Sequence, residues 1–295
     1  MSLVNNIANN IYNDIIKNIP ESLGEFRKLG NEILESICIK NDCFIMYPFV
    51  ASLDGVLMHD VSKTDVLITN TSVLKIDFCI GHRESGEHSF IGRTLSRNND
   101  DESILKFLDK LKSNVIKKVK KGLFETNDEL SLYMQKKCVE NDCEFVENCK
   151  SYMYTDNLLF SDDSKYIMCN YKKYYNDDDI LMEYNDCFDF ESGETYNIDI
   201  SIVKSSDNQP SYKILEAGLG FFNNEVYHLK MKSSRMFFSK AKTLKGNNVF
   251  FLGDYTSGAD KLGKRECEEH GILEYLYPIK CNQNVYSIRF TVTFK

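Results

Sequence analysis

The sequence predicts an α+β protein in which helices and antiparallel strands pack into one large domain. Polar and apolar residues alternate over 195–203, which is typical of a strand with one buried face. Apolar residues recur at helical spacing over 103–121, which predicts an amphipathic helix. The 295 residues contain only four prolines and no Pro- or Gly-rich linker, so no domain boundary is indicated.

The other elements are predicted from the same two periodicities and from capping residues. In the first half they are a helix over 22–37, buried strands over 43–50 and 73–80, a polar loop over 98–102, a cap at Ser103 for the helix that ends near Lys121 before Gly122, and a cap at Asn127 or Asp128 for the next helix. In the second half they are a strand over 227–232, a helix from Ser233 or Ser234 to about Lys245, a helix over 259–270, and strands near 273–280 and 285–294. Residues 148–190 show no clear pattern, and 204–224 is expected to be irregular and insertion-like.

Composition excludes several classes of protein. No apolar run reaches the roughly 18 residues of a membrane-spanning helix, and the first residues lack the basic and apolar regions of a signal peptide. A cytosolic or nuclear protein is therefore expected. The ten cysteines include no C-x2-C pair, so we expect reduced and mostly buried thiols. His82 and His88 flank a short polar stretch and are expected to be loop histidines.

Charge is segregated along the chain. The net charge of −8 argues on average against nucleic acid, but 226–253 contains no acidic residue. Its cations are Lys230, Lys232, Arg235, Lys240, Lys242 and Lys245. A second basic run ends in Lys117, Lys118, Lys120 and Lys121. Both groups are candidates to follow a phosphate backbone, with the second weaker because lysines at a helix C-terminus also complement its dipole. An ordinary solvated helix face is the alternative for the first group.

Several segments resemble the ErbB3-binding (proliferation-associated) protein family. They are Y-H-L-K-M-K-S-S-R-M-F-F-S (227–239), E-C-E-E-H-G-I-L (266–273) and I-R-F-T-V (288–292), with looser agreement in F-I-M-Y-P-F-V-A-S (44–52) and L-K-I-D-F-C-I-G (74–81). The resemblance implies the pita-bread fold of methionine aminopeptidases, with pseudo-symmetric αβ halves near 1–125 and 126–295 and an insertion near 204–240. It also implies a protein that is not a peptidase and that associates with the large ribosomal subunit near the polypeptide exit tunnel.

The resemblance places a degraded metal site in this chain. The related peptidases bind two metals through Asp, Asp, His, Glu and Glu, in that order. The matching positions here are Asp77, Ser89 as the nearest match to the second aspartate, no histidine for the third ligand, Asp199 and Arg289, while His59 matches a histidine that contacts substrate. A guanidinium is always cationic and offers only donors, so Arg289 cannot ligate a metal.

The expected consequence is a pseudoenzyme with no metal ion and no other cofactor. Arg289 is expected to bridge Asp77 and Asp199 and so replace the charge of the metals; an exposed strand arginine is the alternative. The expected function is binding to rRNA and tunnel-exit ribosomal proteins of the large subunit, in ribosome biogenesis, translation control or dormancy. The protein is expected to be a cytoplasmic monomer without membrane contact, and a nuclear or nucleolar location stays open. Two other readings remain: a residual metal-dependent methionine aminopeptidase, and a ribosome-independent interaction scaffold.

Overall fold

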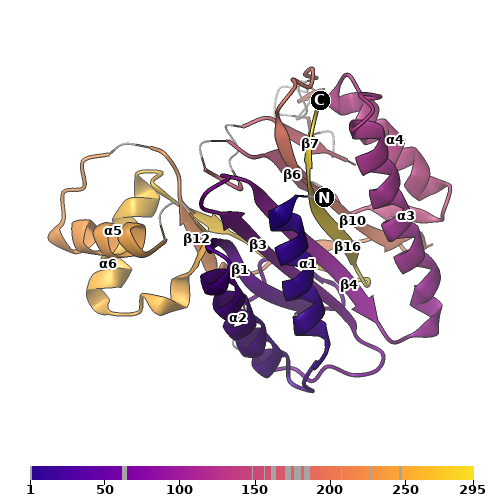
Figure 1. Ribbon diagram of the computed structural model, residues 1–295. Helices are drawn as coiled ribbons and strands as arrows, with labels where there is room; N and C mark the ends of the chain where they lie inside the picture. The colour runs from indigo at the N-terminus through magenta and orange to yellow at the C-terminus, as the bar shows by residue number, and fades with distance from the viewer. Residues whose placement is uncertain are drawn as a thin grey trace.

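A computed structural model describes most of the chain. The residues outside its description are 1, 62–64, 148, 156, 161–163, 170–173, 176–180, 183–186, 207, 226 and 246–247. The described residues form a central sheet, a layer of four helices on one face of it, and a smaller lobe at one end (Figure 1).

The central sheet has eight antiparallel strands, in the order β1-β3-β4-β16-β10-β6-β7 with β5 also paired to β10. The strands are β1 (Cys43–Leu53), β3 (Val73–His82), β4 (His88–Ser96), β5 (Cys143–Phe145), β6 (Lys150–Met153), β7 (Tyr166–Met168), β10 (Thr195–Lys204) and β16 (Tyr286–Thr293). The last strand of the chain, β16, therefore joins strands of the first third to those of the second half.

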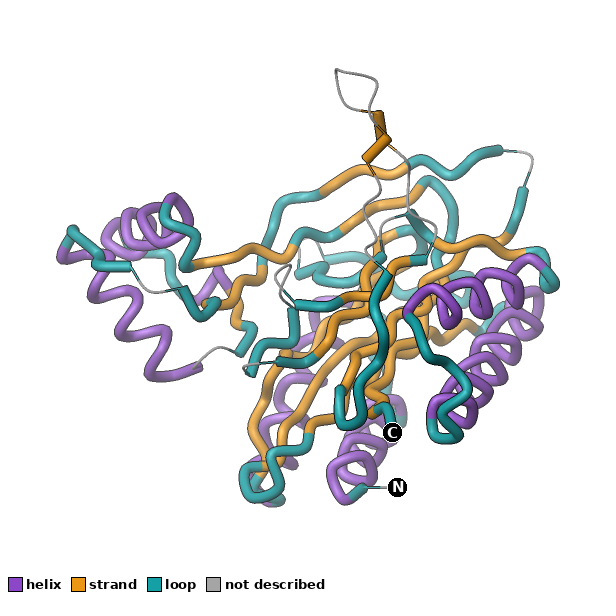
Figure 2. Tube along the Cα trace, turned by 90° about the horizontal axis from the view of Figure 1, so that it is seen from above, coloured by secondary structure: helices purple, strands orange, loops and turns teal. Residues whose placement is uncertain are grey.

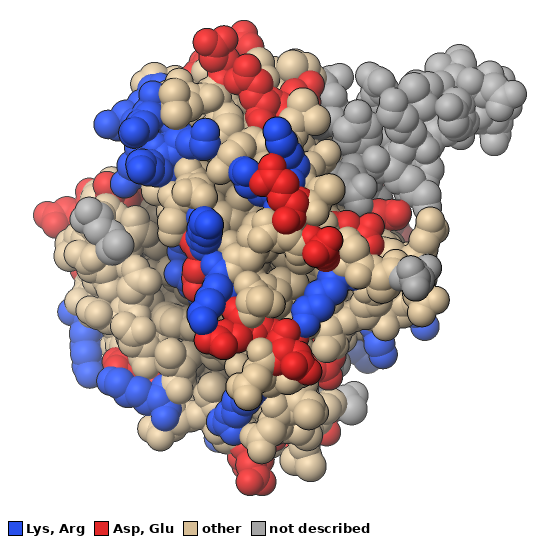
Figure 3. Space-filling view, turned by 90° about the vertical axis from the view of Figure 1, so that its right-hand side faces the viewer, with Lys and Arg blue, Asp and Glu red and all other residues tan. Residues whose placement is uncertain are grey.

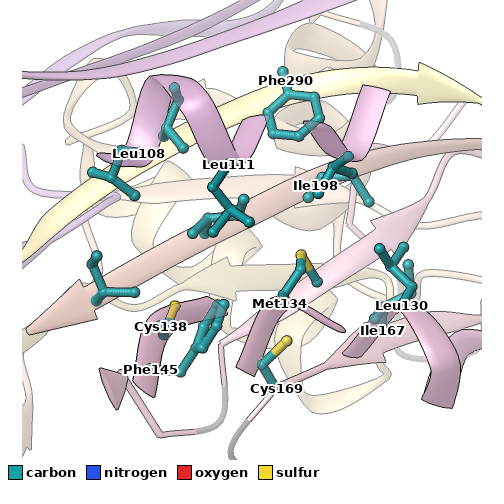
Figure 4. Packing of buried hydrophobic residues seen from close by; sticks show 14 of the residues in the cluster. Leu108, Leu111, Leu130, Met134, Cys138, Phe145, Ile167, Cys169, Ile198 and Phe290 are labelled. Atoms are coloured by element: carbon teal, nitrogen blue, oxygen red, sulfur yellow. The ribbon is translucent and has the colours of Figure 1, made fainter. Parts of the chain in front are cut away.

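Four helices cover one face of this sheet. They are α1 (Leu3–Ile16), α2 (Leu23–Lys40), α3 (Glu102–Val119) and α4 (Asn127–Val139). The first two pack on the β1–β3–β4 side and the last two on the β16–β10 side. Figure 4 shows Leu108 and Leu111 of α3 and Met134 of α4 packed with Ile198 and Phe290 of the sheet. Each fully buried side chain of this kind stabilises the fold by about 1.5–3 kcal/mol.

The smaller lobe contains α5 (Lys232–Lys245) and α6 (Gly258–Glu269), which stand apart from the other helices in Figures 1 and 2. Its sheet has the order β13-β12-β14 and consists of β12 (Leu219–Phe222), β13 (Phe250–Phe251) and β14 (Leu273–Leu276). The remaining short elements are β2 (Val56–Leu57), β8 (Tyr174–Tyr175), β9 (Leu181–Met182), β11 (Tyr212–Ile214), β15 (Ile279–Cys281) and the 3-10 turns η1 (Asn99–Asp101) and η2 (Leu252–Asp254).

Most sequence-predicted elements are present, with shifted ends. Ser22 caps α2, which extends to Lys40, and the two buried strands of the first half are confirmed as β1 and β3. The cap residues of the next two helices were predicted wrongly. Helix α3 begins at Glu102, before Ser103, and Thr126 rather than Asn127 caps α4 by accepting a hydrogen bond from the backbone N–H of Glu129.

The predicted strand over 227–232 is wrong, because this stretch is irregular and α5 begins at Lys232. Its backbone has another partner: the N–H groups of Lys230 and Met231 donate to the Glu266 carboxylate at 2.8 and 3.2 Å. The stretch 204–224 is less irregular than expected, since it includes β11 and β12. Helix α1 was not predicted.

Two further findings concern the cysteines and the helices of the described structure. All ten cysteines are free thiols, and nine are buried while Cys187 is exposed. None of the described helices is both long and apolar enough to span a membrane.

Gly92 permits a close approach inside the central sheet. It lies between Asp77 of β3 and Arg289 of β16 in the strand register. A Cβ added at Gly92 would lie 2.5 Å from the Cβ of Arg289 and 2.6 Å from Oδ1 of Asp77. The Arg289 side chain therefore crosses over Gly92, and no larger residue fits without displacing it.

Replacing Gly92 by Ala is expected to lower the free energy of unfolding by about 1–3 kcal/mol, because the added methyl group overfills this crossing. Urea denaturation measures the change. Gly253→Ala is the matched control, since an added Cβ there meets no atom within 4 Å, and a change within about 0.5 kcal/mol is expected for it. Equal effects of the two substitutions would contradict the close approach.

Candidate functional site

The candidate site lies on the face of the central sheet opposite the four helices, here called the inner face. Strand register places Asp77, Gly92, Arg289 and Asp199 side by side on the consecutive strands β3, β4, β16 and β10. Arg289 is only 3% exposed. Its Nε donates to Oδ2 of Asp199 at 2.9 Å and its Nη1 donates to Oδ1 of Asp77. The bridge expected from the sequence is therefore present.

Ser201 completes this ion group. Nη2 of Arg289 donates to Oγ of Ser201 at 3.2 Å, and that hydroxyl donates to Oδ1 of Asp199 at 2.5 Å. Burial lowers the pKa of Arg289, but Asp199 and Asp77 outweigh burial and raise the pKa above its ordinary value. The guanidinium therefore stays cationic and attracts both carboxylates, which would otherwise repel each other.

The residues at this site do not fit the metal pair of an aminopeptidase. Such a pair needs several carboxylate and imidazole ligands, and a cation at the site repels it. Here the guanidinium of Arg289 holds an oxygen of each of the two aspartates. Across the residues that the structure describes, no group of three or more His, Cys, Asp or Glu side chains could hold a metal ion. The arrangement is an internal ion group in which one guanidinium bridges two carboxylates.

A second buried cation, Lys75, was missed by the sequence analysis. It is 0% exposed, and its Nζ donates to the backbone oxygens of Asp54 and Val73 at 2.6 and 3.3 Å. Burial lowers the pKa of Lys75 to about 7, against the opposing effect of Asp54 and Asp77. The sequence did contain an indication of this burial, because Lys75 lies within an otherwise apolar run around Asp77.

His59 is an internal aromatic residue in this structure. Its Nδ1 lies 2.8 Å from the hydroxyl of Tyr47, and the Phe160 ring meets it edge-on at 5.4 Å. Burial, helped by Arg289, lowers the pKa of His59 to about 3, so the ring is neutral at physiological pH. Phe160 also contacts the rings of Tyr47 and Phe90. Aromatic packing thus fills this part of the inner face.

Ser89 lies away from the ion group. It pairs with Ile80, whose side chain packs among the helices, and its Oγ donates to Oδ1 of Asn5 in α1 at 2.6 Å. Since side chains alternate along a strand, Ser89 is on the helix-covered face. The residue of β4 that lies beside Asp77 is Gly92.

His88 belongs to the inner face, contrary to the expected loop position. It opens β4, and its Nε2 lies 3.0 Å from Oδ1 of Asn197. Its ring packs on Tyr154 at 4.1 Å. Burial lowers the pKa of His88 to about 4 despite the hydrogen bond to Asn197. His82, at the end of β3, is likewise buried.

The first basic group lies on the smaller lobe. Lys230 precedes α5 and Lys232 is its first residue, and both are exposed. Arg235 is also exposed, but its Nη1 donates to the backbone oxygens of Leu229 and Lys230 at 2.9 and 2.7 Å.

Two more lysines of this group lie beside aromatic rings. The Nζ atoms of Lys240 and Lys242 lie 5.2 and 5.5 Å from the ring centroids of Tyr255 and Phe238. The side chain of Lys245 lies outside the described part of the chain. The cations of the lobe therefore differ in their contacts, since Arg235 is hydrogen-bonded to the backbone while Lys240 and Lys242 lie beside aromatic rings.

The second basic group ends α3, on the opposite side of the molecule from α5 in Figure 1. Lys117, Lys120 and Lys121 are exposed, whereas Nζ of Lys118 lies 4.9 Å from the ring centroid of Tyr133. Figure 3, viewed from the side of α3 and α4, shows one compact basic group at the upper left and mixed basic and acidic residues elsewhere. The two basic groups are thus separate surfaces.

Replacing Arg289 by Met is expected to lower the free energy of unfolding at neutral pH by about 3–5 kcal/mol, because two buried carboxylates lose their cation. Urea denaturation measures the loss. The triple variant Arg289→Met, Asp77→Asn, Asp199→Asn also removes the two carboxylate charges that the single variant leaves without a cation. It is expected to recover most of the lost free energy of unfolding. If the free energy of unfolding of the single variant falls by less than about 1 kcal/mol, the ion group does not contribute substantially to the stability of the fold.

Buried neutral histidines predict a dependence of stability on pH. The folded pKa values of His59 and His88 are about 3 and 4, below the ordinary value of 6.5. Between pH 6.5 and 4 the unfolded chain therefore binds more protons than the folded chain, and the free energy of unfolding falls as pH falls.

Each histidine contributes a slope of about 1.4 kcal/mol per pH unit within this window. We expect His88→Gln to reduce the measured slope by about that amount. The exposed His228→Gln is the control and is expected to leave the slope unchanged. The same slope in His88→Gln and the unsubstituted protein would rule out a buried neutral His88.

Comparison with known proteins gives both sequence and structural relatives. No family model matches the chain. It is 24% identical over 262 residues to ERBB-3 binding protein 1 of Solanum tuberosum. The aligned region covers 84% of this chain and 63% of that protein. The chain thus spans less than two thirds of the length of this relative.

Three solved structures share the fold. A thermophilic Arx1 superimposes with a TM-score of 0.73 at 15% identity, over 97% of this chain and 84% of that chain. The methionine aminopeptidase of Rickettsia prowazekii gives 0.51 at 11% identity, over 68% and 77%. That of Thermotoga maritima gives 0.51 at 9% identity, over 92% and 87%. The resemblance to ErbB3-binding proteins is confirmed, and the chain has the pita-bread fold of the methionine aminopeptidases.

Proposed function

We propose that this protein is a catalytically inactive, aminopeptidase-like factor that binds the large ribosomal subunit near the polypeptide exit tunnel. Its basic surfaces contact rRNA phosphates, and neighbouring ribosomal proteins complete the interface. The role lies in ribosome biogenesis, translation control or dormancy. The protein acts as a monomer in the cytoplasm, without membrane contact.

The observation that carries the proposal is the position of Arg289. Its guanidinium bridges Asp77 and Asp199, which the family resemblance matches to two metal-ligand positions. In this proposal the ion group occupies the place where the related peptidases carry out their reaction. The protein then acts by binding partners at its outer surface. The similarity to ERBB-3 binding protein 1, whose name describes binding to another protein, also supports a binding function.

The basic groups supply a surface suited to rRNA. Lys230 and Lys232 are exposed on the smaller lobe, and Lys117, Lys120 and Lys121 are exposed at the end of α3. Lysine contacts to phosphate carry no sequence information but fix position and give affinity that falls with salt. The protein as a whole carries a charge of −8, so binding has to be confined to such local surfaces.

Sedimentation of the purified protein with large ribosomal subunits over a salt series tests this function. We expect binding at low salt, with the logarithm of the binding constant falling linearly with the logarithm of salt concentration. The double variant Lys230→Glu, Lys232→Glu is expected to weaken binding and to reduce the slope by about 1.5–2, because about two phosphate contacts are lost.

The double variant Lys213→Glu, Lys280→Glu is the matched control. These two exposed lysines pair across β11 and β15, so the change in net charge is the same and one like-charged pair replaces another. It is expected to bind nearly as the unsubstituted protein does. No cosedimentation at any salt concentration would overturn the proposal and favour an interaction scaffold that works away from ribosomes.

A further inference from the structure

Strand β11 forms an open edge of a small sheet. The sheet has the order β11-β15-β2, so β11 is paired on one side, by β15. An open edge presents backbone N–H and C=O groups at the spacing that another extended chain requires. Strand β11 is therefore a candidate for pairing with a partner.

The pairing of β11 with β15 decides which backbone groups point off this edge. The backbone N–H of Leu215 donates to the oxygen of Pro278 at 2.8 Å, which marks a hydrogen-bonded pair just past the end of β11. In an antiparallel ladder such pairs alternate with pairs whose backbone groups point the other way. Tyr212 and Ile214 are in these alternate pairs, so their N–H and C=O groups face away from β15. Within the described part of the chain these outward groups have no partner.

Two large apolar side chains are exposed beside this edge. Ile214 is 69% exposed and Tyr277 is 47% exposed. Ile214 pairs with Ile279, and Tyr277 lies two residues before Ile279 along the same chain direction. Because side chains alternate along a strand, Ile214 and Tyr277 belong to the same face of the sheet. A strand added to β11 would cover part of the exposed Ile214 side chain.

The other face of this sheet carries two lysines side by side. Lys213 and Lys280 are directly opposite each other in the strand register, and both are exposed. Like charges in this position destabilise a pair of strands. Within the described structure neither lysine forms an ion pair. A carboxylate placed beside Lys213 would offset the repulsion, so the edge complements an acidic chain.

We propose that an extended acidic segment of a partner protein adds to β11 as a further strand of this sheet. Its backbone pairs with the outward N–H and C=O groups of Tyr212 and Ile214. Because side chains alternate, the residue opposite Lys213 lies on the lysine face and its two neighbours lie on the face of Ile214. The recognised segment is thus an acidic residue between two apolar residues. This inference goes beyond the proposed function, because it adds a protein partner at residues outside the two basic groups.

Other occupants fit this edge less well. A second copy of this chain, paired through its own β11, would bring the lysines of the two copies together. A nucleic acid would satisfy Lys213 and Lys280, but its phosphates carry no donors for the outward C=O groups of β11. A basic peptide would pair with the backbone and add to the charge repulsion. An acidic extended chain uses the backbone groups, the apolar side chain and the lysines together.

The test compares two short fluorescently labelled peptides, using fluorescence polarisation with the full chain. Both peptides alternate valine with a charged residue, which is glutamate in one and lysine in the other. We expect the unsubstituted protein to bind the glutamate peptide about tenfold more tightly than the lysine peptide. The double variant Lys213→Glu, Lys280→Glu is expected to reverse this preference, because its edge complements the lysine peptide.

Ile214→Pro separates strand addition from simple charge attraction. The N–H of Ile214 faces away from β15, so a proline there removes no hydrogen bond of the β11–β15 ladder. It does remove a donor to the added strand, and binding of the glutamate peptide is expected to weaken about tenfold. Ile214→Val keeps this donor and is the matched control, with binding expected to stay within about twofold. Thermal unfolding monitored by circular dichroism checks that each variant is folded.

Equal binding of the two peptides by the unsubstituted protein would overturn the inference. So would undiminished binding of the glutamate peptide by Ile214→Pro, which would reduce the edge to a charged surface. A dimer in sedimentation velocity that Ile214→Pro abolishes would assign the edge to a second copy of the chain instead. Peptide binding is measured without ribosomes, so this inference and the proposed function can fail independently.

Discussion

The ion group of Arg289, Asp77 and Asp199 is the constraint on which the rest of this structure depends. It lies where strands of the first third, β3 and β4, meet strands of the second half, β16 and β10. Burying such a group is costly, because three charges leave water and only good geometry offsets that loss. Once buried, the group penalises any arrangement that separates its members. It therefore holds the strands of the sheet in one register, and Gly92 is the residue that makes room for it.

The same ion group explains why the inner face is packed like a core. A catalytic site needs open space for substrate and water. The Arg289 guanidinium instead takes its hydrogen-bond partners from side chains of the protein itself. Phe160, Tyr47 and Phe90 pack together over this face, and His59 is held neutral among them. Lys75 adds a second buried cation near Asp77, and its backbone acceptors are internal as well.

The ion group was predicted through the family resemblance, which matches Asp77, Asp199 and Arg289 to metal-ligand positions of the related peptidases. An exposed position for Arg289 was the alternative, and the hydrogen bonds of Arg289 to both aspartates decide against it. Ser89 and Gly92 could not be assigned in the same way, since a shift of register by one residue moves a side chain to the other face of the sheet. The length of the β3–β4 turn decides that register, and residue types alone do not report it.

Long-range partners explain the other differences. Residues 227–232 alternate as a strand does, but the Glu266 carboxylate, far along the chain, binds the backbone N–H groups of Lys230 and Met231. Likewise, nothing local indicates that Lys118 packs on Tyr133 or that Lys240 packs on Tyr255. Charge patterning located the basic surfaces, whereas the freedom of each cation depends on aromatic rings supplied by other elements.

Strand β12 connects the filled inner face to the smaller lobe. Phe221 points toward Phe160 and belongs to the inner-face cluster, while the next residue, Phe222, packs on Phe237 of α5. Neighbouring residues of a strand face opposite sides, so one short strand packs into both cores at once. If Phe160 were absent, the inner face would lose the ring that Phe221 contacts, and the lobe would lose part of its attachment. The aromatic packing of the inner face thus attaches the lobe of α5 and α6 to the central sheet.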